Sequence, residues 1–301
     1  MKADSGFARR ITGDQFIITA EYLPSATTEP SAAAKVVEQF GDKIAAINVA
    51  DNPYAVGLSS LAGALAVKNA GGEPIYQIVT RDRNRMAIQS DLLGAASLGI
   101  GNILCLSGYH QVLTGCPESA NVYDIDSVQL VALVKRMTEQ GQLLDGRSIE
   151  GAFAMVAGAA ANPYLQPQEL NMIRLAKKVQ AGAGFIQTQA VFNTDTFAQW
   201  LEAAVKQGLT DRAAILAGVL VLNSADEAEK LRNTFTDFVI GDEVVDRLKQ
   251  AGSPDAQAKE GVAICAEVIK KLKPMKGLKG IHLISGGNEA LVPQVLTAAG
   301  L

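Results

Sequence analysis

The 301-residue sequence contains few of the residue types that most metal and nucleophile centres require. Three cysteines occur, and Cys105, Cys116 and Cys265 lie far apart with no CxxC spacing. We therefore expect neither a disulfide framework nor a zinc or iron–sulfur site on this chain alone, and no metal ion is predicted. Because His110 and His282 are the only histidines, a mechanism that needs a histidine must use one of these two. His110 is expected to be a loop residue, since no serine or cysteine nucleophile motif accompanies it.

Neither the charge pattern nor the apolar runs indicate nucleic acid or a membrane. The formal net charge is −4, and no run of Lys and Arg matches a phosphate backbone. The chain has no stretch of about 18 uninterrupted apolar residues, and its N-terminus lacks a signal-peptide apolar segment. We expect a cytoplasmic protein without a nucleic-acid or membrane partner.

Aromatic residues are scarce at 5%, so the 48% hydrophobic content comes mostly from Ala, Val, Leu and Ile. Short apolar runs alternate with longer amphipathic segments, as in parallel sheets with helical crossovers. Eight repeats favour a closed barrel, so the predicted fold is α/β, a (β/α)8 TIM barrel forming a single domain over residues 1–301. The expected strands are residues 16–22, 44–50, 74–80, 102–108, 151–158, 184–192, 213–222 and 280–287.

Helix boundaries and one long interval complete this prediction. Helical patterns at 224–234, 242–251 and 255–272 predict extra helices between strands 7 and 8. Polar residues at the expected N-cap positions and a glycine at an expected C-cap position mark the ends of helices. These residues are Ser31, Asp82, Asp126, Thr194 and Ser224 for the N-caps and Gly182 for the C-cap.

Polar residues at the carboxyl ends of the strands are the candidates for chemistry, because barrel active sites form there. Glu21 ends an otherwise apolar strand, where partial desolvation would raise its pKa and suit it to donate a proton. The alternative is a glutamate satisfied by an arginine or a backbone group. Gln187 and Gln189 share one strand face, where two amides could hold a heterocycle or form a purely structural network.

Other polar clusters are less specific. Asp51-Asn52-Pro53, after the second strand, is typical of a turn. Arg81, Arg83 and Arg85 could bind a phosphate or form surface salt bridges, and the second is the commoner outcome. No GxGxxG or GxxxxGK[ST] motif occurs, so neither a Rossmann nor a P-loop site is predicted.

Four stretches, taken in order, resemble the methylenetetrahydrofolate reductase family. They are RDRNRMAIQSDLLGAASLGIGNIL (81–104), VYDIDSVQL (122–130), GAAANP (158–163) and KKVQAGAGFIQTQAVF (177–192). The likeness is strongest to the short bacterial form of acetogens and of fusions with methionine-synthesis methyltransferases. It implies a (β/α)8 barrel that carries a flavin, FAD in preference to FMN, and reduces 5,10-methylenetetrahydrofolate to 5-methyltetrahydrofolate.

The resemblance also assigns site residues. Glu21 matches the acid that protonates the substrate, and Gln189 matches the glutamine that contacts substrate and, in some members, the nicotinamide. Glu21, Gln189 and Tyr109 are the expected substrate-binding residues. The positive charge of Lys178 would balance the negative charge of the flavin phosphate. The full set of expected flavin contacts is Gln77, Thr80, Ser107, Gly108, Tyr123, Asp126, Ala159 and Lys178.

Three positions depart from the family pattern. Tyr109 stands where most relatives have an aspartate that bonds the pterin, Gln77 where many have histidine, and Gly184 where Asp or Asn is common. The resemblance leaves the electron donor open between NAD(P)H and reduced ferredoxin. It also implies a homo-oligomer or a hetero-complex with an iron–sulfur or methyltransferase partner subunit. Because of Tyr109, a folate-binding homologue with little reductase activity, serving methyl transfer, stays open as the alternative.

Overall fold

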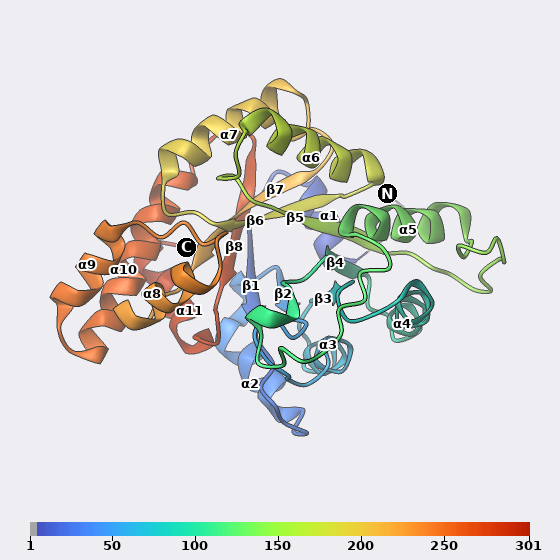
Figure 1. Ribbon diagram of the computed structural model, residues 1–301, viewed down its shortest axis with the longest axis horizontal. Helices are drawn as coiled ribbons and strands as arrows, with labels where there is room; N and C mark the ends of the chain where they lie inside the picture. Colours follow the sequence, from blue (N-terminus) through green and yellow to red (C-terminus); the bar gives the residue numbers. More distant parts are fainter. Residues whose placement is uncertain (1–4) are drawn as a thin grey trace.

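A closed barrel of eight parallel strands forms the centre of the computed structural model, which describes residues 5–301 (Figure 1). Each strand pairs with the next in chain order, and β8 closes the barrel against β1. The strands are β1 Ile17–Tyr22, β2 Ala46–Val49, β3 Pro74–Val79, β4 Asn102–Leu106, β5 Val156–Ala161, β6 Phe185–Ala190, β7 Ala214–Leu220 and β8 Leu278–Ile284. The predicted (β/α)8 barrel is confirmed.

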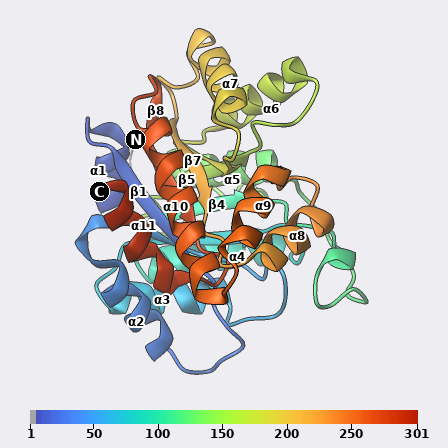
Figure 2. The same ribbon diagram turned by 90° about the vertical axis from the view of Figure 1, so that its left-hand side faces the viewer.

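Helices surround the barrel, and the three helices between β7 and β8 gather at one side, on the left in Figure 1 and facing the viewer in Figure 2. The interval between β7 and β8 holds α8 Ala225–Thr234, α9 Asp242–Ala251 and α10 Pro254–Leu272, within one residue of the predicted extra helices. The others are α1 Gly6–Thr12, α2 Ser31–Phe40, α3 Ser60–Asn69, α4 Arg85–Ser97, α5 Ser127–Gln140, α6 Gln168–Ala181, α7 Thr194–Lys206 and α11 Val292–Ala299, with short 3-10 turns at Gly41–Lys43, Gln111–Leu113 and Glu289–Leu291. No helix in residues 5–301 is long and apolar enough to cross a membrane.

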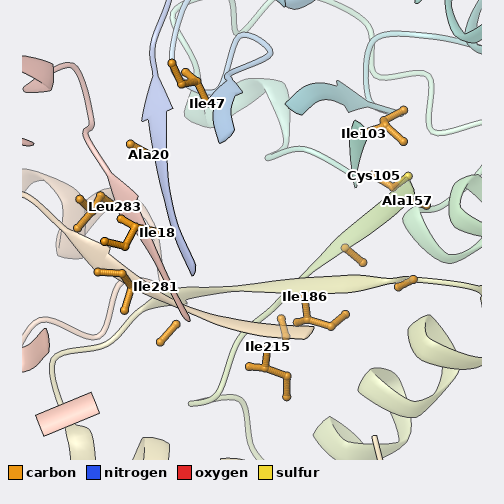
Figure 3. Close-up of a cluster of buried hydrophobic side chains, with 14 of the residues drawn as sticks. Ile18, Ala20, Ile47, Ile103, Cys105, Ala157, Ile186, Ile215, Ile281 and Leu283 are labelled. Atoms are coloured by element: carbon orange, nitrogen blue, oxygen red, sulfur yellow. The ribbon is translucent and has the colours of Figure 1, made fainter. Parts of the chain in front are cut away.

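Successive side chains along each strand point alternately into and out of the barrel, and this divides the core into two layers. Outward-facing side chains pack against the helices, and Figure 3 labels ten of them: Ile18, Ala20, Ile47, Ile103, Cys105, Ala157, Ile186, Ile215, Ile281 and Leu283. Inward-facing residues at the amino end of the barrel form a separate cluster, which Phe7 of α1 caps by contacting Phe185 edge to face at 5.1 Å. A Cβ on Gly158 would lie 2.2 Å from the Phe185 ring, so glycine is required there.

Several predicted boundaries were wrong. The eighth strand ends at Ile284, not at residue 287, because Gly286 and Gly287 have φ values of +58° and +96°. The fifth strand begins at Val156, not at residue 151, because its neighbour β4 begins at Asn102, the partner of Val156, and Gly151 itself has a φ of +84°. The N-caps of α4 and α7 are Asn84 and Asn193, not Asp82 and Thr194. The Asp82 carboxylate instead binds the Arg81 guanidinium.

The predicted N-cap of α2 was also wrong. Ser31 is its first helical residue, and Pro30 stands at the N-cap without a side-chain bond. The predicted caps at Asp126, Ser224 and Gly182 are confirmed.

Candidate active site

Glu21 lies near the carboxyl end of β1, on the face that points into the barrel. Its Oε2 accepts a hydrogen bond from the Gly286 N–H at 3.2 Å, in the turn that follows β8. Burial raises the pKa of Glu21 to about 7, and the Glu289 carboxylate adds to this while the Gly286 N–H opposes it. No Lys or Arg among residues 5–301 forms an ion pair with Glu21. The raised pKa predicted for Glu21 is therefore present, and so is the backbone hydrogen bond that the alternative interpretation predicted.

Two further carboxylates lie on this side of the barrel mouth. Glu289 accepts hydrogen bonds from the Leu23 N–H at 2.8 Å and the Ser285 hydroxyl at 3.2 Å. Glu227, on α8, accepts from the Asn223 N–H at 2.7 Å, and burial raises the pKa of its carboxyl. The mouth therefore carries acidic groups held by neutral donors, which favours a ligand with N–H groups or positive charge.

Gln187 belongs to a structural network inside the barrel, the second of the two interpretations of its sequence. It exchanges hydrogen bonds of 2.8 and 2.9 Å with the Asn48 amide, and its Nε2 also donates to the Thr19 hydroxyl at 3.1 Å. That hydroxyl lies 3.0 Å from Nδ1 of His282, whose pKa burial lowers to about 3. All four side chains are buried, so this layer forms the floor beneath the mouth.

Gln189 lies one layer higher and is only half-buried. The pairing of β6 with β7 shifts register between Gln187 and Ala190, next to Gly218. A Cβ on Gly218 would lie 2.2 Å from the Thr188 carbonyl, so only glycine permits this bulge. Bulges re-aim side chains. Here the Gln189 Nε2 donates to Oδ2 of Asp237 at 2.5 Å.

Asp237 is the site residue that sequence reasoning missed. It lies between α8 and α9, and its Oδ2 also accepts the Tyr109 hydroxyl proton at 2.9 Å. Burial raises the pKa of Asp237, while the Tyr109 bond opposes the rise. The available signal was an acid placed between two aromatic residues in FTDF.

Tyr54 lies near both Glu21 and the Gln189–Asp237–Tyr109 group. Burial raises the pKa of Tyr54, and the nearby charges of Glu21, Asp237 and Glu227 raise it further, in that order. The Tyr54 ring packs on Phe235, which also contacts the Tyr109 ring at 4.5 Å. Glu21 and the Gln189–Asp237–Tyr109 group thus occupy one mouth, lined by aromatic rings.

The three arginines after β3 are paired and hold no free charge for a phosphate. Arg81 binds Asp82 at 2.7 Å, and Arg83 binds Asp51 at 2.7 Å. Arg85 binds Asp124 at 2.8 Å. A cavity of about 400 Å³ lies beside them, lined by loops after β2, β3 and β4 and without Glu21 in its wall. The predicted salt bridges are confirmed, but only Arg85 is exposed, so the prediction that the cluster lies on the surface was wrong for the buried Arg81.

Two predicted loop residues behave as expected. Asn52 has a φ of +47°, and its Oδ1 accepts the Gly57 N–H at 2.8 Å, which confirms a turn. His110 is exposed and starts a 3-10 turn by accepting the Val112 N–H. Residues 5–301 hold no cluster of three or more His, Cys, Asp or Glu side chains that could bind a metal ion.

Four of the expected flavin contacts meet at the ends of β3 and β4. The Tyr123 N–H donates to the Thr80 carbonyl at 3.2 Å, and the Tyr123 hydroxyl to the Gly108 carbonyl at 3.2 Å. Ser107 follows β4, where its carbonyl accepts the Arg81 N–H at 3.0 Å. The Thr80 hydroxyl is fully buried yet has no hydrogen-bond partner. A buried hydroxyl without a partner is costly, so this atom fits a ligand contact.

The other expected contacts are more dispersed. Lys178 donates to the Ala160 carbonyl at 2.6 Å, and burial, followed by the charge of Arg174, lowers the pKa of its amine. Asp126 caps α5 through the Gln129 N–H at 2.7 Å. Gln77 is buried on β3, and the Ala159 side chain is buried among residues packed against the helices. A flavin contact at Ala159 would thus involve its backbone.

Comparison with known proteins identifies the family of the chain. A sequence model of the family described as methylenetetrahydrofolate reductase matches residues 7–300. The chain belongs to the methylenetetrahydrofolate reductase family. A probable methylenetetrahydrofolate reductase (NADPH) from Caenorhabditis elegans is 21% identical over 248 residues, which cover 81% of this chain and 34% of that protein. This reductase-family chain therefore spans about a third of the length of the curated relative it matches.

One solved structure shares the architecture of this family member over its whole length. It is an uncharacterized protein from Clostridium thermocellum that binds two copies of 5-methyl-5,6,7,8-tetrahydrofolic acid. The two chains align with a TM-score of 0.69 and 13% sequence identity, over 98% of each. At that identity the likeness supports the fold.

Proposed function

We propose that the protein catalyses flavin-dependent reduction of 5,10-methylenetetrahydrofolate to 5-methyltetrahydrofolate. Family membership over residues 7–300 supports this reaction, and the structural neighbour that binds 5-methyltetrahydrofolic acid supports a folate ligand. The observation that carries the proposal is Glu21, a carboxyl inside the barrel mouth whose pKa is about 7. A group with that pKa is protonated often enough at neutral pH to act as a general acid.

Glu21 would protonate the substrate nitrogen whose bond to the bridging carbon breaks. The five-membered ring then opens, and the bridging carbon becomes part of an iminium cation. The Glu21 carboxylate that remains, together with Glu289 and Glu227, gives the mouth a negative charge that stabilises this cation. Hydride addition to the iminium carbon yields the methyl group, so one proton and one hydride complete the reaction.

The residues present fit a flavin. The unpartnered Thr80 hydroxyl offers a hydrogen bond to its ring system, and Lys178 with Arg174 offers positive charge to its phosphate. A bound flavin, FAD in this proposal, would supply the hydride. NAD(P)H or reduced ferredoxin would reduce the flavin again. Gln189 and Asp237 would hold the substrate against it.

The test is the visible spectrum of the purified protein after reconstitution with FAD, followed by anaerobic addition of 5-methyltetrahydrofolate. Loss of the oxidised flavin absorbance on addition supports the reductase half-reaction. A protein that takes up neither FAD nor FMN but binds 5-methyltetrahydrofolate would overturn the proposal and favour the folate-binding alternative in methyl transfer.

A further inference from the structure

We propose that the Asp237 carboxylate recognises the substrate at this site and that Tyr109 positions it. The carboxylate would bind the edge of a ring that carries adjacent N–H donors. The inference rests on the proposed function, because it assigns how the same mouth recognises the pterin ring. It goes beyond family membership in naming a residue from the segment between α8 and α9, far along the chain from the strand ends that supply Glu21 and Gln189.

Aromatic packing brings this segment to the mouth. The Phe235 ring lies 4.5 Å from the Tyr109 ring and 5.4 Å from the Tyr54 ring, and Phe238 packs on it in turn at 6.0 Å. Phe235 and Phe238 are both buried. Asp237 lies between these two anchors in sequence, so its carboxyl is held at the mouth by the packing on either side.

The carboxylate has acceptor capacity left over. The Tyr109 hydroxyl and the Gln189 amide both donate to the same oxygen, Oδ2, at 2.9 and 2.5 Å. Neither of them uses Oδ1. Among residues 5–301 no Lys or Arg forms an ion pair with Asp237, and its side chain is only half-buried. A carboxylate held in this way offers its second oxygen to a ligand.

The chemistry of the surroundings specifies that ligand. Asp237, Glu21 and Glu227 all act electrostatically on Tyr54, so the mouth is acidic on both sides. The free Oδ1 of Asp237 can accept a charge-assisted hydrogen bond from an N–H group at the edge of a planar ring. Planar rings also pack on aromatic side chains such as Tyr54 and Tyr109. The 2-amino-4-oxopyrimidine edge of a pterin has this donor pattern.

The test measures the Kd of two ligands by calorimetry. They are 5-methyltetrahydrofolate and an analogue whose 2-amino group is replaced by a methyl group. The variants are Asp237→Asn and Tyr109→Phe, with Asp246→Asn as a matched control, because Asp246 is exposed on the neighbouring α9. Asp237→Asn should weaken 5-methyltetrahydrofolate binding by roughly ten- to a hundredfold, since charge-assisted hydrogen bonds are lost.

The ratio of the two Kd values distinguishes recognition from a merely structural effect. The wild-type protein and Asp246→Asn should prefer 5-methyltetrahydrofolate over the analogue, whereas Asp237→Asn should bind both about equally. Tyr109→Phe should reduce the preference to an intermediate value, and it serves as the test if Asp237→Asn does not fold. An unchanged preference in both variants would overturn the role of Asp237. Failure of the wild-type protein to bind 5-methyltetrahydrofolate would instead overturn the proposed function as well.

Discussion

Replacing Glu21 by glutamine should make the protein more stable at alkaline pH and, in the proposed mechanism, should abolish opening of the folate ring. A buried carboxyl with a raised pKa favours the protonated form in the folded state, so ionisation opposes folding. The stability that Glu21 contributes is fully present below a pH of about 4.5, its ordinary pKa. It is lost as the pH rises through the folded-state pKa of about 7. Glutamine has the same shape and cannot ionise.

The size of the effect follows from the two pKa values. The difference between 4.5 and about 7, at about 1.4 kcal/mol per pH unit, corresponds to roughly 3 kcal/mol. Because the carboxyl is partly accessible at the mouth, water screens some of this, and we expect about 2–3 kcal/mol. Glu21→Gln and the wild type should therefore unfold with similar free energies at acid pH, and the variant should gain 2–3 kcal/mol above pH 7.

Urea denaturation at a series of pH values measures this difference directly. Glu38→Gln, an exposed substitution on α2, removes the same charge and controls for net charge. A gain that does not change with pH, or a gain equal to that of Glu38→Gln, would refute the assignment of a titrating acid to Glu21. A pH-dependent gain together with lost folate reduction would exclude misfolding as the cause of inactivity.

Three further predictions concern the floor and the flavin contacts. Asn48→Leu and Gln187→Leu should each lower the unfolding free energy by about 2 kcal/mol, because the amide of the other residue is left buried and unpaired. In urea denaturation, the double variant should lose less than the sum of the two single losses. Simple additivity of the losses would contradict the pairing. Thr80→Val should leave stability unchanged in the same assay yet weaken FAD binding roughly tenfold in a fluorescence titration, while Lys178→Met should weaken it in a salt-dependent way. His282→Gln should flatten the loss of unfolding free energy as the pH falls from 6.5 toward 3, because the wild-type histidine takes up a proton only on unfolding; an unchanged slope would contradict a buried neutral His282.

The barrel itself could be predicted from the sequence because its strands are local apolar runs. The run FIITAEY becomes β1 almost residue for residue, and the extra helices after β7 follow from their own periodicity. The fifth strand shows the limit of this reasoning. The apolar residues at 151–155 resemble a strand, but the pairing with β4 begins only at Val156 and that with β6 only at Gly158. Local composition does not show where a partner strand begins.

Site residues could be predicted from the sequence only where the local pattern of a single strand end identifies them. Glu21 follows from a charged residue in an apolar strand, and its partner Gly286 lies 265 residues away. The Asp237 contacts span 128 residues to Tyr109 and 48 to Gln189, and no local pattern encodes them. The resemblance to the reductase family marks Tyr109 as the loss of an aspartate. The structure shows that a carboxylate from another segment lies beside its hydroxyl.

Reoxidation of the reduced flavoprotein by 5,10-methylenetetrahydrofolate, followed anaerobically by stopped-flow absorbance, tests the central role of Glu21 most directly. The wild-type protein should recover oxidised flavin absorbance at a rate that falls as the pH rises through about 7, because the acid must be protonated. Glu21→Gln should bind and retain reduced flavin without reoxidation by the folate. Reoxidation of Glu21→Gln at the wild-type rate would contradict the assignment of Glu21 as the proton donor.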